Sequence, residues 1–257
     1  MNYYLTDSIY INNDKTYYES ENNKIKKITK NNWHNYLNDY GWCKLSLGWK
    51  RRLKEGKNSC FGLLECGSDG DCLFHVLCES LNSEYLMKLR MPKYNVEKLR
   101  LMVANEINKD NFLMIIESYK LDYEDNEDNE YNFSGEWDPY SIKNISQLRK
   151  EIIKGGNNFW GDHILLQLLQ KKLKLNIIIL NSDNNKDTSN IEDRFRIHPL
   201  ASLDLKENNR TIIIYYLDQY HFQLIGYYTG TIMKSLFSNN DLPKILLDIY
   251  NHDCRNN

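Results

Sequence analysis

Apolar positions in the second half of the chain occur in short runs of strand length. Leu175 to Leu180 is a continuous aliphatic run, and Thr211 to Leu217 is rich in β-branched and aromatic residues. Phe222 to Tyr228 follows after a short polar connection, and Arg194 to His198 alternates weakly between apolar and polar. Runs of this length and composition are typical of β-strands. We expect a strand at each run, and the two on either side of the connection should form an antiparallel hairpin.

Two helices are predicted in the middle of the chain, at Leu73 to Leu89 and at Val96 to Ile107. The second has the apolar residues Val96, Leu99, Val103 and Ile107 on one helical face. Ser146 is a candidate N-cap for a helix that runs to Ile153. This helix should end at Gly155-Gly156, because glycine adopts the left-handed conformation that ends helices at little cost.

Two more helices are predicted toward the carboxyl end. Asp162 precedes the helix His163 to Lys172, where a carboxylate stabilises the positive end of the helix dipole. Pro243 is suited to the first turn of a terminal helix that has Ile245, Leu246 and Ile249 on one face. Helices first and a mostly antiparallel sheet later predict an α+β fold, with helices packed on a central sheet.

The chain shows no internal repeat and no linker rich in Gly, Ser or Pro. We expect a main domain at 56–230, preceded by an N-terminal extension or small helical subdomain at 1–55 and followed by a C-terminal helical tail at 231–257. Within the extension, Thr29 is a candidate N-cap for a short helix that carries Trp33, Tyr36 and Leu37. The acidic stretch Asp122 to Glu130 predicts a surface loop.

Composition and charge limit the classes of partner. The 257 residues are 41% hydrophobic, and 33 Lys and Arg against 35 Asp and Glu give a net charge of −2. A near-neutral chain has no overall attraction to nucleic acid or anionic membranes, so neither partner is expected. No apolar run approaches the about 20 residues that a spanning helix needs. The first residues do not resemble a secretory signal, so we expect a cytoplasmic protein.

Six cysteines fit the reducing cytosol better than a framework of disulfides. Cys60, Cys66, Cys72 and Cys78 follow one another at intervals of six, which suggests a metal-binding repeat. No short C-x2-4-C knuckle is present, however, so we expect buried structural cysteines and no metal site. Many Asn pairs, with abundant Lys, Ile and Tyr, suggest an AT-rich genome such as that of a large DNA virus, a protist or an intracellular bacterium.

The segment Gly67 to His75 carries the strongest chemical signal. A small polar loop runs directly into an apolar helix, and Cys72 lies at the amino end of that helix. Unpaired backbone N–H groups and the helix dipole favour a thiolate there, and the same N–H groups can bind an oxyanion. Gly70 and Asp71 would then form the oxyanion loop beside a nucleophilic Cys72, with Gly70 allowing a close approach to substrate.

A cysteine nucleophile requires a base, which is usually a histidine held by a third group. Among the six histidines, His221 is placed best, because it begins a hydrophobic strand just after a tight connection. That location puts an imidazole at the edge of a sheet, where a cleft can open. A structural histidine is the alternative interpretation of His221 when it is considered alone.

The motifs DGDCLF at Asp69 to Phe74, WGD at Trp160 to Asp162 and YHFQLI at Tyr220 to Ile225 resemble those of the ovarian tumour (OTU) family of papain-like cysteine proteases. The resemblance covers about Gly62 to Tyr228. It implies a papain-like OTU catalytic domain that needs no cofactor. The implied activity is that of a deubiquitinase, which hydrolyses isopeptide bonds after the C-terminal glycine of ubiquitin or polyubiquitin. By motif match, Cys72 is the nucleophile, His221 the general base and acid, and Asp69 the acidic residue of the loop.

The chain departs from the family pattern two residues after the histidine, where Gln223 replaces the common Asp or Asn. An uncharged amide stabilises an imidazolium less than a carboxylate does. Gln223, Asp69 or another carboxylate such as Asp218 could orient the imidazole; the other interpretation of Gln223 is a solvated strand residue with no role. The departure also raises a second hypothesis, a ubiquitin-binding pseudoenzyme. A protease for another ubiquitin-like modifier or for a viral polyprotein is a third.

Two aromatic residues are candidates for the substrate channel. Trp160 precedes a predicted helix, and Phe222 is next to the candidate base. Each could contact the flexible tail of ubiquitin. For Trp160 the alternative is a core anchor, which is the commoner role of a tryptophan before a helix.

Overall fold

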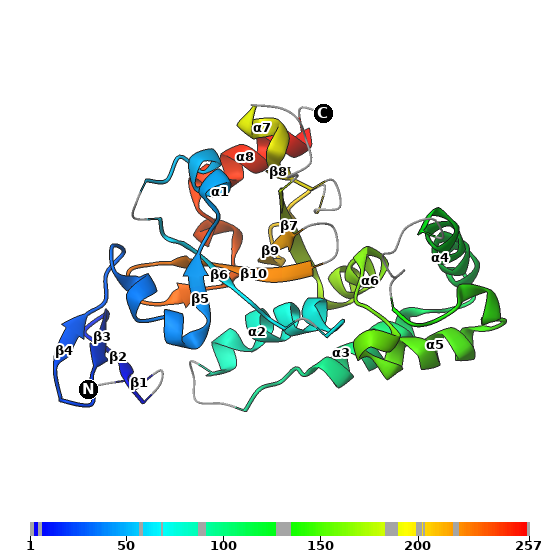
Figure 1. Ribbon diagram of the computed structural model, residues 1–257, viewed down its shortest axis with the longest axis horizontal. Coiled ribbons are helices and arrows are strands. Elements are labelled where there is room, and N and C mark those ends of the chain that lie inside the picture. Colours follow the sequence, from blue (N-terminus) through cyan, green and yellow to red (C-terminus); the bar gives the residue numbers. More distant parts are fainter. Residues whose placement is uncertain are drawn as a thin grey trace. The chain divides into compact units, whose positions relative to one another are not determined.

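The chain divides into two compact units, which are visible in the computed structural model (Figure 1). Unit 1 comprises residues 1–65, 79–93 and 176–257, and unit 2 comprises residues 66–78 and 94–175. Within the part of the chain that the structure describes, no helix is long and apolar enough to cross a membrane. The structure describes residues 3–4, 7–56, 59–67, 69–86, 91–126, 135–182, 190–198, 202, 204–217 and 221–255.

The main sheet of unit 1 contains β5 (Trp42–Lys44), β6 (Phe61–Leu64), β7 (Leu175–Ser182), β8 (Phe195–Ile197), β9 (Arg210–Leu217), β10 (His221–Tyr228), β11 (Met233–Lys234) and β12 (Leu236–Phe237). Its order is β5-β6-β10-β9-β7-β8, with β11 beside β10 and β12 beside β9. The pairs β5–β6, β6–β10, β9–β10 and β7–β8 are antiparallel. The predicted hairpin and the mostly antiparallel sheet are therefore confirmed.

One face of this sheet packs against α1 (Leu47–Arg52) and α8 (Lys244–Arg255), which lie close together in Figure 1. Side chains alternate along a strand, so residues two apart share a face. This face and the two helices bury Ile178, Leu180, Ile213, Ile225, Trp49, Leu246 and Ile249 in one core. The terminal helix is thus confirmed, and Ile245 is partly buried against the same core.

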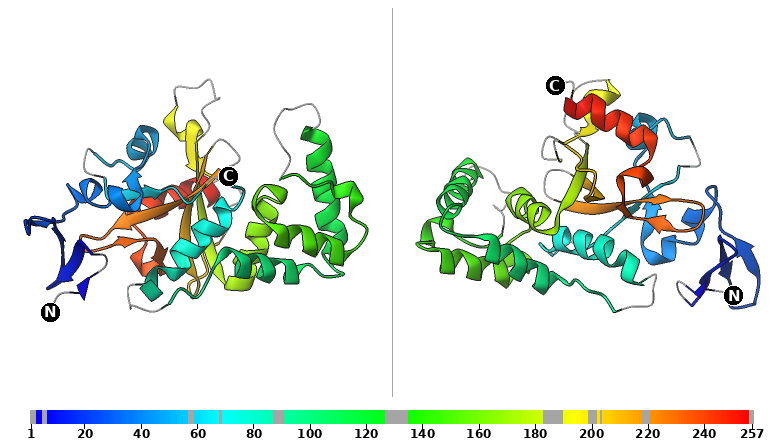
Figure 2. Two further views of the ribbon diagram at one scale, coloured as in Figure 1. Left: turned by 60° about the horizontal axis from the view of Figure 1, so that its bottom comes forward. Right: turned by 180° about the vertical axis from the view of Figure 1, so that it is seen from behind.

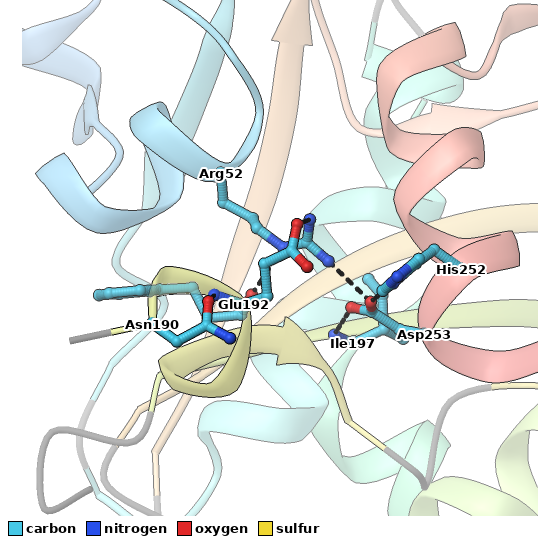
Figure 3. Close-up of polar contacts among 7 residues, drawn as sticks. Arg52, Asn190, Glu192, Ile197, His252 and Asp253 are labelled. Carbon is cyan, nitrogen blue, oxygen red and sulfur yellow. Dashed lines mark hydrogen bonds and ion pairs between the residues drawn. The ribbon is translucent and has the colours of Figure 1, made fainter. Parts of the chain in front are cut away.

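A buried arginine joins the two helices of this core to the edge of the sheet (Figure 3). Arg52, at the end of α1, donates from Nη1 to Glu192 at 2.9 Å and from Nη2 to Asp253 of α8 at 2.7 Å. Its Nε donates to the Phe195 carbonyl at 3.2 Å. The other oxygen of Asp253 accepts the Ile197 amide at 2.9 Å. Glu192 belongs to α7 (Ile191–Arg194), a short helix that leads directly into β8.

The described residues among the first 27 form strands and turns and no helix, which corrects the predicted helical character of the extension. They contain β1 (Tyr3–Tyr4), β2 (Ile9–Asn12), β3 (Lys15–Glu19) and β4 (Ile25–Lys27), which form an antiparallel sheet in that order. The turn between β2 and β3 places Asn13 and Asp14 at φ 47° and 57°, the left-handed values of a tight hairpin.

Short 3-10 turns follow this sheet, at Trp33–Asn35 and Asn38–Tyr40. Thr29, the predicted N-cap, is not the N-cap of the first 3-10 turn; residue 32 occupies that position. Trp33 packs in a small core with Ile9, Ile28 and Tyr228. Residues 42–53 contribute β5 and α1 to the main sheet and its core, whereas the domain boundaries at 55 and 230 stay predictions.

Unit 2 is helical, as Figure 2 shows in two further views. The predicted helices at 96–107, 146–153 and 163–172 are confirmed within a few residues. The helix predicted at 73–89 is confirmed as far as Leu86, and residues 87–89 lie outside the described part of the chain. A helix at Phe112–Asn126 was not predicted. Asp162 is the N-cap of the last helix, and its carboxylate accepts the Leu165 amide at 2.9 Å. The helices are α2 (Cys72–Leu86, shared with unit 1), α3 (Val96–Glu106), α4 (Phe112–Asn126), α5 (Ile145–Lys154) and α6 (His163–Leu173).

Two details of unit 2 differ from the sequence predictions. Asn144, and not Ser146, caps α5, since its side chain accepts the Gln147 amide at 3.1 Å. The stretch predicted as an acidic loop begins inside α4, because residues 122–126 form the end of that helix. Residues 127–134 lie outside the described part of the chain.

Candidate active site

The candidate nucleophile begins a helix in unit 2. Cys72 is the first residue of α2 and is buried. The loop before it turns through Gly67 and Gly70, whose φ values are +101° and +81°. The Asp71 carbonyl accepts the His75 amide at 2.9 Å, which closes the first turn of the helix. The cysteine therefore stands at a helix N-terminus, as its sequence context predicts; the intervening Ser68 lies outside the described residues.

Gly70 packs so closely against the rest of unit 2 that no other residue fits. A Cβ atom at this position would lie 2.4 Å from the Gly156 carbonyl oxygen and 2.6 Å from Cδ1 of Trp160. The Gly70 carbonyl accepts the Gly161 amide at 3.1 Å. The indole of Trp160 thus packs on the cysteine loop, which favours the anchoring role over contact with substrate.

The two acidic residues of the loop have different surroundings. Asp71 turns into unit 2, where its carboxylate pairs with the buried Arg100 and accepts the Gly156 amide at 3.1 Å. Asp69 has a side chain that is 69% exposed and lies 4.0 Å from Nε2 of His75. The role of Asp69 in the reaction stays a prediction, and Asp71 is a structural contact as well as a neighbour of the nucleophile.

The candidate base lies at the start of β10 in unit 1, and a carboxylate holds it. Nε2 of His221 is 2.5 Å from Oε1 of Glu65, and the side-chain amide of Gln223 donates to the other oxygen of Glu65. Strand register explains the contact: Leu64, the last residue of β6, pairs with Leu224 of β10, so Glu65, the residue after β6, falls beside residues 221–223. His221 and Gln223 share a face because they are two apart.

The Glu65 carboxylate determines how the imidazole can act. A carboxylate accepts the proton on Nε2, so the neutral ring has its basic lone pair on Nδ1. When the ring is protonated, the negative charge of Glu65 stabilises the imidazolium. The carboxylate of Glu65 contacts the ring, and Gln223 in turn binds that carboxylate. Among the candidates named from sequence, Asp218 lies outside the described residues.

Glu65 is the functional residue that sequence reasoning missed. No motif contains it, and its neighbour in space is 156 positions away in the chain. The available signal was indirect: Glu65 is a carboxylate at the end of the apolar run 61–64, which becomes the partner strand of β10.

Phe222 occupies the opposite face of β10 from the candidate base. Its side chain is 4% exposed and stacks on Tyr216 of β9, with ring centroids 4.7 Å apart and planes inclined by 21°. A side chain so deeply buried offers almost no surface to a peptide. Its burial speaks against a place in a substrate channel.

The cysteine repeat does not assemble a cluster. Cys60, Cys66, Cys72 and Cys78 are all buried. Burial raises the pKa of the Cys60 thiol, which disfavours the thiolate that metal binding requires. Among the described residues, no group of three or more His, Cys, Asp or Glu side chains is placed to hold a metal ion.

Comparison with known proteins defines the family. Residues 67–226 match the sequence model of the OTU-like cysteine proteases, a segment that contains both Cys72 and His221. The chain belongs to this family. Its enzyme class is therefore that of an OTU-like cysteine protease with an α+β, papain-like fold. The match begins two residues after Glu65, so the carboxylate on the imidazole lies outside the family segment.

Solved OTU structures are similar to the chain at low identity. An OTU domain in complex with ubiquitin is 14% identical over 76% of this chain and 88% of its own, with a TM-score of 0.41. An OTU deubiquitinase from Wolbachia pipientis is 14% identical over 74% and 95%, with a TM-score of 0.38. The Hazara virus OTU bound to ubiquitin is 15% identical over 65% and 81%, with a TM-score of 0.34. Comparison with curated proteins gives no match.

Proposed function

We propose that this OTU protease is a deubiquitinase that hydrolyses the isopeptide bond after the C-terminal glycine of ubiquitin in conjugates or chains. The observation that carries the proposal is the Glu65 carboxylate on Nε2 of His221, in a chain whose family motif places a cysteine at the start of α2. Ubiquitin is the substrate that the family resemblance implies. The cytoplasm, where conjugates are abundant, is the proposed place of action.

In the first half of the proposed reaction, Cys72 attacks the carbonyl carbon of the terminal glycine. The thiol proton passes to Nδ1 of His221, and a sulfur–carbon bond forms. Backbone N–H groups at the start of α2 stabilise the oxyanion. The carbon–nitrogen bond then breaks, and the imidazolium gives its proton to the departing lysine amine. The products of this half are a free lysine and a thioester between Cys72 and ubiquitin.

Water completes the cycle. His221 takes a proton from the attacking water, and the new carbon–oxygen bond replaces the sulfur–carbon bond of the thioester. The proton returns to the sulfur of Cys72, and ubiquitin leaves with a free carboxyl terminus. During both halves, Glu65 keeps the Nε2–H bond and stabilises the transient positive charge on the ring. No cofactor is needed at any step.

The charge of Glu65 bears on the hypothesis of a pseudoenzyme. That hypothesis rested on Gln223, which has no charge to stabilise an imidazolium. Because Glu65 supplies a carboxylate to the same ring, the substitution by glutamine no longer argues for an inactive protein.

A covalent probe tests the proposal. Full-length protein and the Cys72→Ala variant are incubated with ubiquitin that carries a C-terminal electrophile, and adducts are detected by mass. The proposal expects an adduct and hydrolysis of diubiquitin with the wild type only, and the same loss of hydrolysis with His221→Ala. Hydrolysis retained by folded Cys72→Ala would overturn the assignment.

The same experiment separates the other substrates. Probes made from other ubiquitin-like modifiers are run in parallel with the ubiquitin probe. Reaction with one of these and not with ubiquitin would move the proposal to a protease of that modifier. Tight binding of ubiquitin without any adduct, by protein shown to be folded, would identify a binding module.

A further inference from the structure

A buried ion pair lies directly before the candidate nucleophile. Arg100, in the middle of α3, is 2% exposed, and its Nε donates to Oδ1 of Asp71 at 2.5 Å. Its Nη2 also reaches the same carboxylate. Asp71 is the residue that immediately precedes Cys72, and its side chain is 15% exposed. The loop is therefore attached to α3 through a charge-assisted pair that is largely shielded from water.

The guanidinium of Arg100 has its remaining donors on two other backbone segments. Nη1 donates to the carbonyl of Ile152 near the end of α5, at 2.8 Å, and Nη2 donates to the carbonyl of Phe159, at 2.8 Å. The guanidinium also lies over the ring of Phe74, 4.2 Å from its centre. One side chain thus joins the cysteine loop and its helix to the turn between α5 and α6.

That turn is shaped around the ion pair. A Cβ atom at Gly155, whose φ is +72°, would lie 2.8 Å from Nε of Arg100. The next residue, Gly156, donates its amide to the second oxygen of Asp71 at 3.1 Å. Both oxygens of the carboxylate are therefore in use, one on Arg100 and the other on the turn that also packs against Gly70.

The energetics indicate that the pair does more than fill space. Taking two charges out of water costs several kcal/mol, and apolar side chains of similar volume often stabilise a core equally well. Burial lowers the pKa of Arg100, and the Asp71 carboxylate opposes that shift. Unlike an apolar contact, the ion pair is directional, because the planar guanidinium of Arg100 fixes the position of the Asp71 carboxylate.

We propose that Arg100 is a positioning residue for the nucleophile. Acting through Asp71, it holds the backbone of residues 70–72 so that the thiol of Cys72 and the N–H groups at the start of α2 keep their reactive arrangement. This inference rests on the proposed function, because the reaction that Arg100 would support is the proposed hydrolysis. Arg100, which is distant from Cys72 in the sequence, would then be needed for that reaction.

The test measures the reactivity of Cys72 in two assays, one without ubiquitin and one with a ubiquitin substrate. Alkylation of Cys72 by iodoacetamide is followed against pH at the Cys72 peptide by mass spectrometry, in wild type, Arg100→Met and Arg100→Lys. Hydrolysis of a fluorogenic ubiquitin substrate gives kcat and KM for the same proteins. Loss of positioning predicts that the midpoint of the alkylation profile moves to higher pH, because the helix N-terminus stabilises the thiolate less. It also predicts a fall of about 100-fold in kcat with KM nearly unchanged.

Two further variants separate position from charge and from stability. The double variant Asp71→Asn with Arg100→Met removes both charges, so the net charge near Cys72 is unchanged; it should still show the shift. Arg52→Met removes the buried arginine of unit 1, which has a comparable set of partners (Figure 3), and should lower the melting temperature without moving the Cys72 profile.

The outcomes decide between the two proposals. A wild-type profile in folded Arg100→Lys and in the double variant would overturn the positioning role, and so would an equal shift in Arg52→Met. If Arg100→Met does not fold, these other variants carry the test. Absence of any reaction between wild type and ubiquitin would overturn the proposed function, while the alkylation profile, which needs no ubiquitin, would still decide the role of Arg100.

Discussion

The candidate nucleophile in unit 2 and the candidate base in unit 1 are held in different ways. The cysteine loop of unit 2 is fixed by Asp71, which binds an arginine that is 2% exposed and the backbone amide of Gly156. The imidazole of His221 in unit 1 is held by Glu65, whose side chain is 54% exposed. Buried charge pairs are screened little by salt, whereas exposed pairs are screened strongly. The candidate nucleophile is thus held by a contact that salt screens little, and the candidate base by a contact that salt screens strongly.

The largest effect on turnover is expected in the cysteine half, from Gly70→Ala. The new methyl group would collide with the Gly156 carbonyl and Trp160, at a φ of +81° that disfavours alanine. We expect kcat/KM to fall about 100-fold or more, because a shift of about 1 Å at reacting atoms has that effect.

Gly230→Ala is the matched control for this variant. Gly230 has a φ of +100°, but a Cβ atom there would meet nothing within 4 Å. It should cost only about 1 kcal/mol of stability and leave turnover unchanged. Equal turnover in the two variants would show that the cysteine loop tolerates displacement, and would contradict the claim that turnover depends on its position.

Glu65→Gln addresses the histidine half. Losing the negative charge destabilises the imidazolium, so we expect kcat to fall about 10- to 100-fold. The limb of the pH–rate profile that reports His221 should move to lower pH, because an imidazole without a nearby carboxylate is less basic.

Glu117→Gln, an exposed carboxylate of α4 that pairs with Lys120, is the control and should change neither quantity. Raising the salt concentration should weaken the Glu65 contact, and with it the turnover of wild type, more than that of Glu65→Gln. An unshifted profile in Glu65→Gln would remove Glu65 from the proposed mechanism.

Asp253→Ala breaks a buried network in unit 1 that does not include the imidazole. The variant leaves Arg52 without one of its carboxylates and the Ile197 amide without its acceptor. We expect a loss of about 3 kcal/mol of unfolding free energy, measured by urea denaturation. Turnover below the melting temperature should not change, and Asp248→Ala, an exposed change on the same helix, should be nearly neutral.

The smallest effect is expected from Asp241→Asn. Lys234 and Ser238 hold the pKa of Asp241 at about 2, below its ordinary 3.8. A lowered carboxyl pKa stabilises the fold above the ordinary value, and this stabilisation is lost as the pH falls from 3.8 to about 2. Since the side chain is 42% exposed, we expect a loss below about 1 kcal/mol at neutral pH that vanishes near pH 2. A difference that persisted at pH 2 would contradict the assignment.

The sequence predicted those elements whose pattern is local. About ten neighbouring residues are enough to recognise the long apolar runs of β7, β9 and β10 and the glycine loop before Cys72. β5 and β6 were missed because they are only three and four residues long and β6 contains Gly62. The N-terminal sheet was misjudged because tyrosines and lysines hide its alternation, although Asn13-Asp14 is a typical hairpin turn.

In the candidate site, too, the residues that could be predicted are those that lie in a local sequence pattern. Cys72 and His221 stand in motifs, so their positions follow from a few neighbours. Glu65 and Arg100 reach the site through strand pairing and helix packing, which connect residues 156 and 29 positions apart. A single sequence does not reveal which of its many carboxylates and arginines such pairings bring together.

The order of these residues in the chain also sets when activity can arise during synthesis. Glu65 and Cys72 are made before His221, which follows Glu65 by 156 positions. At about 5–20 residues per second, translation needs about 8–30 s to cover that distance. β6 has no β10 to pair with until then, so a nascent chain carries a cysteine without its base. Hydrolysis is therefore expected to begin only when the last strands of the main sheet have left the ribosome.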